Sequence, residues 1–293
     1  MISTGIKRIG GKSKLVNILL EHTPYHEGFL SLFTGSGIYE VNKPRASYEV
    51  LNDLDSELMN YFTIIQNNPL EFEQYKKGVF GLCSKYLFDQ IRDKKILPRN
   101  DVERAYFFYY LVKISFAGLT KQYFGMNYKS RDCYRSQDNG LLTPLDPRLM
   151  KRLHRVYLLN QDFTRCHAIF KKFISKKGLR EDVFMYCDPP YPGTENVFLN
   201  KFKKQDHYKL IEILSNTKFK FMLSIGGDCG AYLDQLSHLI IKEVKTVYSA
   251  NARSQYERKE YLITNYDMNE VPRMVFGNNQ HTINHFLGEV EKK

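Results

Sequence analysis

The chain has 293 residues, 43% of them hydrophobic, enough to bury a substantial core in one large domain or in a domain with a smaller one inserted. Its 43 lysines and arginines against 32 aspartates and glutamates give a net charge of +11, which indicates a polyanionic partner. The apolar runs are far shorter than the roughly 20 residues of a bilayer helix, so we expect a cytoplasmic protein.

Cysteine and histidine spacing indicates neither disulfides nor a metal site. The five cysteines are scattered and form no CxxC pair, and the eight histidines show no HExxH spacing. We expect reduced thiols and no bound metal, with His22 and His26 solvated at a helix end.

The N-terminal part alternates between helical and strand patterns. We predict a helix over 13–22, a strand over 27–33, a strand over 46–52 and a helix over 56–66. This alternation is typical of an α/β sheet.

The middle of the chain breaks the alternation. Segments 69–91 and 101–116 carry apolar residues at helical spacing, and a stretch with glycine, tyrosine and arginine follows. We interpret 69–158 as an inserted, mainly helical domain between two parts of one α/β domain, 1–68 and 159–266.

Strand patterns return after the insertion. We predict strands over 182–187, 219–225, 238–248 and 259–266, and a helix over 206–216. The tail, 267–293, has no assigned role.

Two glycines follow the first predicted strand in "FTGSG", residues 33–37. Gly35 and Gly37 permit a tight turn, so a cofactor can lie across the end of the sheet. Asp53, at the end of the next strand, has the position from which α/β folds bind ribose hydroxyls. The turn is not GxGxxG, which argues against a dinucleotide-binding dehydrogenase and favours a nucleoside without phosphates.

Another glycine pair lies in "GGK", residues 10–12, ahead of the first strand. By itself this motif is best interpreted as a turn before a helix, with Lys12 solvated.

The stretch "DPPY", residues 188–191, ends a predicted strand. A nucleobase amine is a poor nucleophile because its lone pair is delocalised, so an enzyme that methylates it must hold it with acceptors. Asp188 and the Pro189 carbonyl are acceptors, and the two prolines, Pro189 and Pro190, stiffen the turn. Tyr191 is expected to be an exposed phenol whose aromatic face can stack on a base. A proline-stiffened β-turn is the structural alternative.

With these motifs in order, the sequence resembles the Dam-type (class alpha) DNA adenine-N6 methyltransferase family over about residues 6–266. The matching motifs are "GGK", "FTGSG", the Asn52-Asp53 pair, "NQDF" at 160–163, "DPPY", "MLS" at 222–224 and a closing "NY".

The resemblance implies a Rossmann-like S-adenosylmethionine-dependent methyltransferase fold, with 69–158 as the target-recognition domain. It also implies methyl transfer to N6 of an adenine flipped out of double-stranded DNA, and it allows a cognate restriction endonuclease as a second partner. Asp188, Pro189, Pro190 and Tyr191 would be catalytic.

The same resemblance implies the cofactor site. Asp53 would hold the ribose hydroxyls, and Asp162 and Phe163 would flank the adenine of the cofactor. The other implied contacts to S-adenosylmethionine are Arg8, Gly10, Gly11, Lys12, Phe33, Gly35, Gly37 and Asp188.

The chain departs from the family pattern in three places. Arg8 stands where an aromatic residue is usual, "IGG" follows "MLS" in place of an asparagine, and "AGL" replaces "NGL" in the middle segment. The target sequence is therefore open.

Basic residues cluster at 128–135, 171–180 and 201–204, and the first cluster interleaves them with aromatic residues. We expect DNA contacts from residues 121–135, although a solvated charged loop is the alternative. The candidate DNA-binding residues are Lys121, Tyr123, Lys129, Arg131 and Arg135, with Phe124, Tyr128 or Tyr134 packing at the opened base pair.

Two other functions stay open. An N4-cytosine methyltransferase would share the fold and cofactor but usually carries serine at the position of Asp188. A catalytically silent DNA-binding subunit would retain the fold and lose the chemistry.

Overall fold

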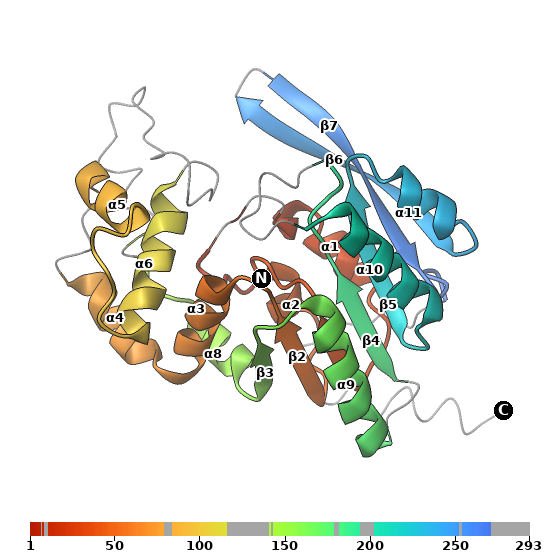
Figure 1. The fold of residues 1–293 in the computed structure, drawn as a ribbon, viewed down its shortest axis with the longest axis horizontal. Helices are drawn as coiled ribbons and strands as arrows, with labels where there is room; N and C mark the ends of the chain where they lie inside the picture. Colours follow the sequence, from red (N-terminus) through yellow and green to blue (C-terminus); the bar gives the residue numbers. More distant parts are fainter. Residues whose placement is uncertain are drawn as a thin grey trace.

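A single mixed sheet of seven strands organises the chain (Figure 1). The computed structural model describes residues 1–6, 8, 11–78, 84–115, 141, 143–178, 182–193, 202–251 and 254–270, with the backbone alone at 246–251 and 254–258. The strands are β1 (Gly28–Ser31), β2 (Tyr48–Asn52), β3 (Val156–Leu159), β4 (Val183–Cys187), β5 (Lys220–Gly226), β6 (Ile240–Asn251) and β7 (Ser254–Thr264).

The strand order is β3-β2-β1-β4-β5-β7-β6. The first five strands in this order are parallel, whereas β7 runs antiparallel to both β5 and β6. The order reverses between β1 and β4, so the crevice beyond the ends of these two strands is the switch point where α/β sheets bind ligands.

Side chains of the central strands alternate between two cores, which makes a three-layer structure. In β4, Phe184 and Tyr186 face one core, whereas Val183 and Met185 face the other. The first core is covered by α1 (Val16–Glu21), α2 (Ile38–Asn42), α3 (Ser56–Asn67) and α8 (Pro147–Leu153). The second is covered by α9 (Phe163–Lys177), α10 (Lys204–Asn216) and α11 (Gly230–Gln235).

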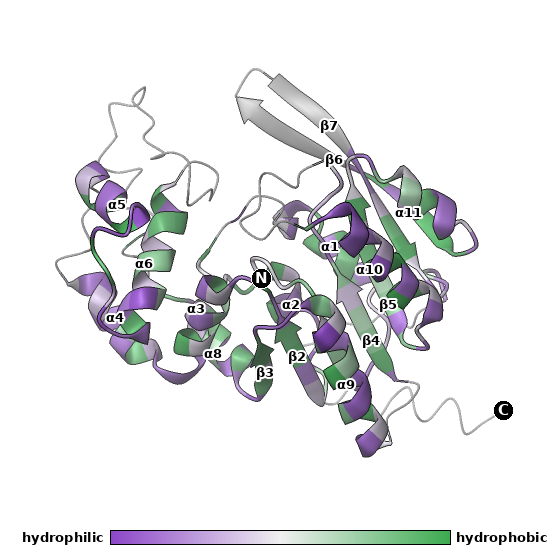
Figure 2. Cartoon of the chain, viewed as in Figure 1, coloured by the Kyte–Doolittle hydropathy of each residue, from purple (hydrophilic) through white to green (hydrophobic). Residues whose placement is uncertain are grey.

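The hydropathy of the elements follows these layers. Figure 2 shows mostly apolar residues along β4 and a mixture of apolar and polar residues along α9 and α10, whose buried apolar residues belong to the second core. In the parts of the chain that the structure describes, none of the helices has the length and apolarity needed to cross a bilayer.

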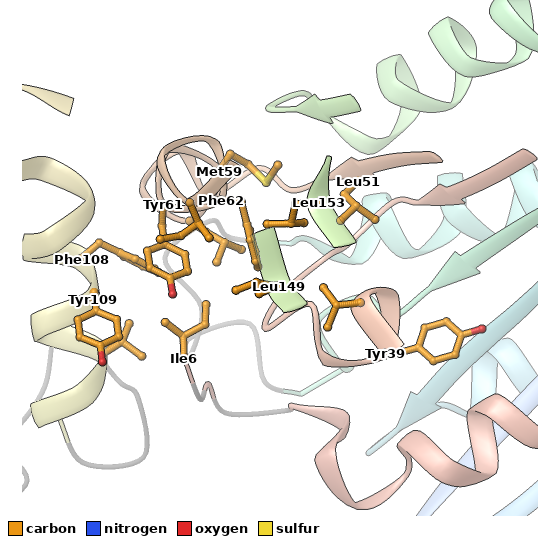
Figure 3. Packing of buried hydrophobic residues seen from close by; sticks show 14 of the residues in the cluster. Ile6, Tyr39, Leu51, Met59, Tyr61, Phe62, Phe108, Tyr109, Leu149 and Leu153 are labelled. Atoms are coloured by element: carbon orange, nitrogen blue, oxygen red, sulfur yellow. The ribbon is translucent and has the colours of Figure 1, made fainter. Parts of the chain in front are cut away.

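Three further helices lie at the β3 edge of the sheet, namely α4 (Pro69–Lys77), α5 (Lys85–Arg92) and α6 (Asp101–Ile114) (Figure 1). Of these, α4 and α6 pack on α3, and α5 packs on α6. Tyr61 of α3 stacks on Tyr109 of α6 at 6.2 Å between ring centroids, and its hydroxyl donates to the Thr4 carbonyl (Figure 3). The helices and the sheet therefore share one continuous core.

The β3 strand crosses the predicted end of the insertion at residue 158. Its residues Val156–Leu159 pair with β2 as the outermost strand of the sheet. The division at 158 into an inserted domain stays a prediction, but the sheet takes in the last residues of that segment.

The predicted helices and strands each overlap an observed element of the same type, but α2, β3, α8, α9 and α11 were missed. The longest of these, α9, has only four buried residues, so its apolar signal is diluted by a basic exposed face.

The prediction that His22 and His26 are solvated is wrong, because both are buried. His26 Nε2 lies 3.1 Å from Lys43 Nζ, and burial together with Lys43 lowers the pKa of His26 to about 3. His22 Nε2 lies 2.8 Å from Lys242 Nζ. The helix α1 ends at Glu21, and in the segment that follows both histidines, Thr23 and Pro24 are buried.

Candidate active site

The turn after β1 adopts the tight conformation that its glycines predict. Gly37 N donates to the Thr34 carbonyl at 2.9 Å, and Gly35 and Gly37 have φ angles of 53° and 68°. A Cβ on Gly37 would lie 2.9 Å from Cζ of buried Phe62, whereas a Cβ on Gly35 would meet nothing within 4 Å. The backbone at Gly35 therefore faces open space at the switch point, as a cofactor cradle requires.

Asp53 holds this turn from the end of the neighbouring strand. Its carboxylate accepts from Gly35 N at 2.8 Å and from Asp55 N at 2.9 Å. Burial raises the pKa of Asp53, and the charge of Arg8 opposes that shift. The carboxylate thus lies beside the glycine turn, where ribose hydroxyls could reach its remaining lone pairs.

The "NQDF" segment is fastened to the same loops. Asn52 Nδ2 donates to the Leu32 carbonyl at 3.1 Å and to the Gln161 carbonyl at 3.0 Å. Exposed Asp162 caps α9 by accepting from Thr164 N at 2.9 Å. The chain ends of β1, β2 and β3 are therefore locked together by one asparagine.

Three aromatic rings pack together beyond the ends of β1 and β3. The ring centroid of Phe33 lies 5.4 Å from that of Phe163 and 5.6 Å from that of Phe202, and the centroids of Phe163 and Phe202 are 5.5 Å apart. Phe33 and Phe163 were predicted from the sequence as cofactor contacts. Phe202 was missed, because it lies within the cluster 201–204, which was noted only for its lysines. The rings form an apolar wall suited to a planar group.

Lys12 is buried, so its interpretation as a solvated residue is wrong. Its side chain is 5% exposed, and Nζ lies 2.7 Å from both Asp188 Oδ1 and the Tyr191 hydroxyl. Burial alone would lower the pKa of Lys12, but the fields of Asp188, Tyr191 and Glu260 outweigh it and raise that pKa well above its ordinary value. The "GGK" segment therefore carries an ammonium ion into the "DPPY" loop.

Asp188 is partly exposed in this cluster, with 20% of its side chain accessible. Burial raises the pKa of Asp188 to about 6, and the neighbouring Lys12 ammonium limits the shift. Asp188 is thus an ionised acceptor near neutral pH, held at the switch point by a lysine.

The prediction that Tyr191 is an exposed phenol is wrong, since it is half-buried. Its hydroxyl accepts from Lys12 and donates to Glu260 Oε2 at 2.8 Å. Glu260, on β7, is 3% exposed and was not predicted from the sequence. The available signal was an acid two residues before Leu262, in phase with the buried face of that strand.

The "IGG" departure now has a structural reason. A Cβ on Gly226 would lie 2.8 Å from Cε2 of Tyr191, and Gly227, with a φ of 71°, would place a Cβ 2.9 Å from the Pro192 carbonyl. The glycine pair therefore makes room for the "DPPY" loop to pack against the end of β5.

Of the remaining predicted residues, Arg8 and Gly11 lie near the glycine turn and Asp53, and the others lie outside the described residues. Arg8 pairs with Asp55 at 2.8 Å and lies 5.9 Å from the Phe108 ring, and Gly11 N donates to the Arg8 carbonyl at 3.0 Å. Gly10 and the candidate DNA-binding residues Lys121, Tyr123, Lys129, Arg131 and Arg135 lie outside the described residues, as do Phe124, Tyr128 and Tyr134.

Fold and site together define the class of Rossmann-like, S-adenosylmethionine-dependent methyltransferases. The glycine turn, the Asp53 carboxylate and the aromatic wall suit a nucleoside cofactor, and the acidic loop at the adjoining strand end suits an amine substrate.

The chain belongs to the D12 class N6 adenine-specific DNA methyltransferase family, whose model matches residues 9–265. It is 24% identical to the type II methyltransferase M1.LlaDCHI of Lactococcus lactis subsp. cremoris, over 89% of this chain and 94% of that protein. It is also 24% identical to the retron Ec67 DNA adenine methylase of Escherichia coli, over 73% of this chain and 72% of that protein. The predicted family, the Rossmann-like methyltransferase fold, the adenine-specific activity and the cofactor are thereby confirmed, whereas the inserted target-recognition domain stays a prediction.

Proposed function

We propose that Asp188 and the Pro189 carbonyl hold the N6 amine of an adenine flipped out of double-stranded DNA. The proposal rests on one observation: a partly exposed carboxylate at the switch point already accepts from a nitrogen donor, Lys12, at 2.7 Å. Acceptors on both amine hydrogens would draw the nitrogen toward a tetrahedral geometry and stabilise its developing positive charge. S-adenosylmethionine supplies the electrophilic methyl group.

Lys12 Nζ already lies 2.7 Å from one carboxylate oxygen of Asp188, Oδ1. Binding of the amine to that oxygen would require the ammonium of Lys12 to move or to share its acceptor. Since Lys12 also contacts the Tyr191 hydroxyl and lies 3.7 Å from Glu260, it keeps polar partners when Asp188 turns to the substrate.

The cofactor contacts are proposed around the glycine turn. Asp53 would accept from the ribose hydroxyls, Phe33 and Phe163 would pack on the adenine ring, and Asp162 would accept from its amine. Arg8 acts indirectly in this proposal, through its ion pair with Asp55. The remaining proposed contacts are Gly10, Gly11, Lys12, Gly35 and Gly37.

The direct test is incubation of the purified protein with unmethylated bacterial DNA and tritiated S-adenosylmethionine, followed by digestion to nucleosides. We expect the label in N6-methyladenine, and single-molecule sequencing would then give the target site. Label in N4-methylcytosine alone would overturn the adenine assignment. Cofactor and DNA binding without any incorporation would indicate the silent subunit.

The raised pKa of Asp188 predicts an acidic limb in the rate. Because a protonated carboxyl loses its negative charge and one acceptor, kcat/KM for DNA should fall as the pH is lowered through about 6. An aspartate with an ordinary pKa would leave the rate flat down to about pH 4. DNA affinity measured by anisotropy at each pH separates binding from chemistry, and a flat kcat/KM between pH 7 and 5 would contradict the prediction.

The segment 69–158 is proposed to recognise the target, with Lys121, Lys129, Arg131 and Arg135 contacting phosphates or base edges and the neighbouring aromatic residues, Tyr123 among them, packing at the opened pair. Each lost phosphate contact reduces the slope of log K against log salt by about 0.9. Replacing Arg131 and Arg135 by alanine should thus weaken DNA binding and flatten that slope by up to about 2.

Titration of labelled DNA at several salt concentrations measures this effect. Replacement of Lys176 and Lys177, exposed at the far end of α9, is the matched control and should leave the slope nearly unchanged. An unchanged slope in the Arg131 and Arg135 variant would remove both residues from the phosphate contacts.

A cognate restriction endonuclease is proposed as a partner in the cell, because one relative is named a type II methyltransferase. Once the target site is mapped, a host extract that cleaves unmethylated but not methylated copies of that site would support this pairing. An extract that spares both would contradict it.

A further inference from the structure

Glu260 and Gly226 lie opposite each other on β7 and β5, and the side chain of Tyr191 packs against both. They are cross-strand partners in the antiparallel pairing. The missing side chain at Gly226 leaves the space that the Tyr191 ring occupies, and Glu260 accepts the Tyr191 hydroxyl at 2.8 Å. The "DPPY" loop is thereby attached to a strand far along the chain.

The charge of Glu260 adds a second role. Lys12 Nζ lies 2.7 Å from Asp188 and 3.7 Å from Glu260, so one buried ammonium stands between two carboxylates. Lys12 and Glu260 are 5% and 4% exposed at the side chain, and a buried ammonium without a carboxylate partner is strongly unfavourable. A single acidic partner would tie Lys12 to Asp188, but two allow it to shift between them.

We propose that Glu260 is a positioning residue for methyl transfer: it fixes the Tyr191 ring through the hydroxyl and serves as the counter-ion of Lys12 while Asp188 accepts the substrate amine. This inference rests on the proposed function, in which Lys12 moves from Asp188 or shares it when the amine binds.

The electrostatics around Asp188 make the proposal testable by pH. Glu260 raises the pKa of Asp188 and Lys12 lowers it. Removing the Glu260 charge acts twice in the same direction, because it deletes a negative neighbour and leaves Lys12 to Asp188 alone. Among the described residues, the ionisable groups that interact with Asp188 are Lys12 before α1, Glu40 of α2, Asp53 after β2, Tyr186 and Cys187 of β4, Tyr191 of its own loop and Glu260 of β7.

The test is Glu260→Gln in the full chain, which keeps an acceptor for Tyr191 and removes the charge. We expect kcat to fall roughly tenfold with KM for DNA nearly unchanged, since Glu260 acts on methyl transfer through Tyr191 and Lys12 and not on DNA contacts. The acidic limb of the rate should also move down by about half a pH unit. Glu243→Gln is the matched control, because Glu243 lies on the same hairpin but is 38% exposed and pairs only loosely with Lys259 at 3.4 Å.

A second readout does not depend on activity. The Asp188 carboxyl can be titrated by ¹³C NMR in the protein without DNA, with the resonance assigned by Asp188→Asn. The same downward movement in Glu260→Gln is expected there, even if the wild type does not methylate adenine. An unmoved titration and an unmoved rate limb would overturn the proposal whatever the activity.

If the Glu260→Gln variant does not fold, Tyr191→Phe provides the test instead. Tyr191→Phe removes the hydroxyl that Glu260 holds and changes the volume little. Loss of kcat with unchanged thermal unfolding supports the proposal, whereas an unchanged kcat overturns it.

Discussion

Alanine at position 188 is expected to reduce methyl transfer to DNA by about a thousandfold or more. Asp188 is the acceptor that meets the developing charge on the amine, and losing one such preorganised group costs about a hundredfold to a thousandfold in kcat. The loss also removes the counter-ion nearest to Lys12, which stands 2.7 Å away and would then lie against Glu260.

The measurement is single-turnover transfer from tritiated S-adenosylmethionine, with cofactor affinity determined by calorimetry. Asp182→Ala is the matched control, because Asp182 precedes the opposite end of the same strand, β4, and should retain activity. Transfer within tenfold of wild type by the Asp188→Ala variant would contradict the proposed role.

Alanine at position 37 is expected to destabilise the fold by about 3 kcal/mol. Gly37 has a φ of 68°, which costs a residue with a Cβ about 1–2 kcal/mol. The new Cβ would also lie 2.9 Å from Cζ of Phe62, a fully buried ring on α3, and such overpacking costs about 1–3 kcal/mol.

Gly35→Ala separates these two causes. Gly35 has a similar φ of 53° but a Cβ there would meet nothing within 4 Å, so only the backbone cost of about 1–2 kcal/mol should appear. Urea unfolding of both variants gives the comparison. Equal losses in the two variants would show that Phe62 yields without cost.

Much of the site followed from local sequence. The glycine turn at 33–37, the acid after the second strand and the acidic proline loop are each short motifs at strand ends, and parallel strands bring their carboxyl ends to one edge of the sheet. Their order along the chain was enough to identify the family, which the match over residues 9–265 confirms.

The missed features depend on contacts between distant parts of the chain. Glu260 meets Tyr191, 69 residues away in sequence, and Lys12 meets it from 179 residues away. The local sequence around Glu260 and around Lys12 does not indicate that either residue contacts Tyr191. Phe202 was missed for the same reason, because its role depends on Phe33 and Phe163.

The sequence by itself determined the chemistry and the class of fold: which acceptors, which glycine turn and which alternating strands the chain carries. Only the tertiary structure decided the charge state and orientation of the groups, since both depend on burial and on neighbours from other strands. Lys12, which the local sequence suggested to be solvated, is a buried ion beside Asp188 in the structure, and the Tyr191 hydroxyl points toward Glu260 of β7. A carboxylate or an ammonium acquires its strength from the low-dielectric site that folding builds around it, and no local pattern encodes that environment.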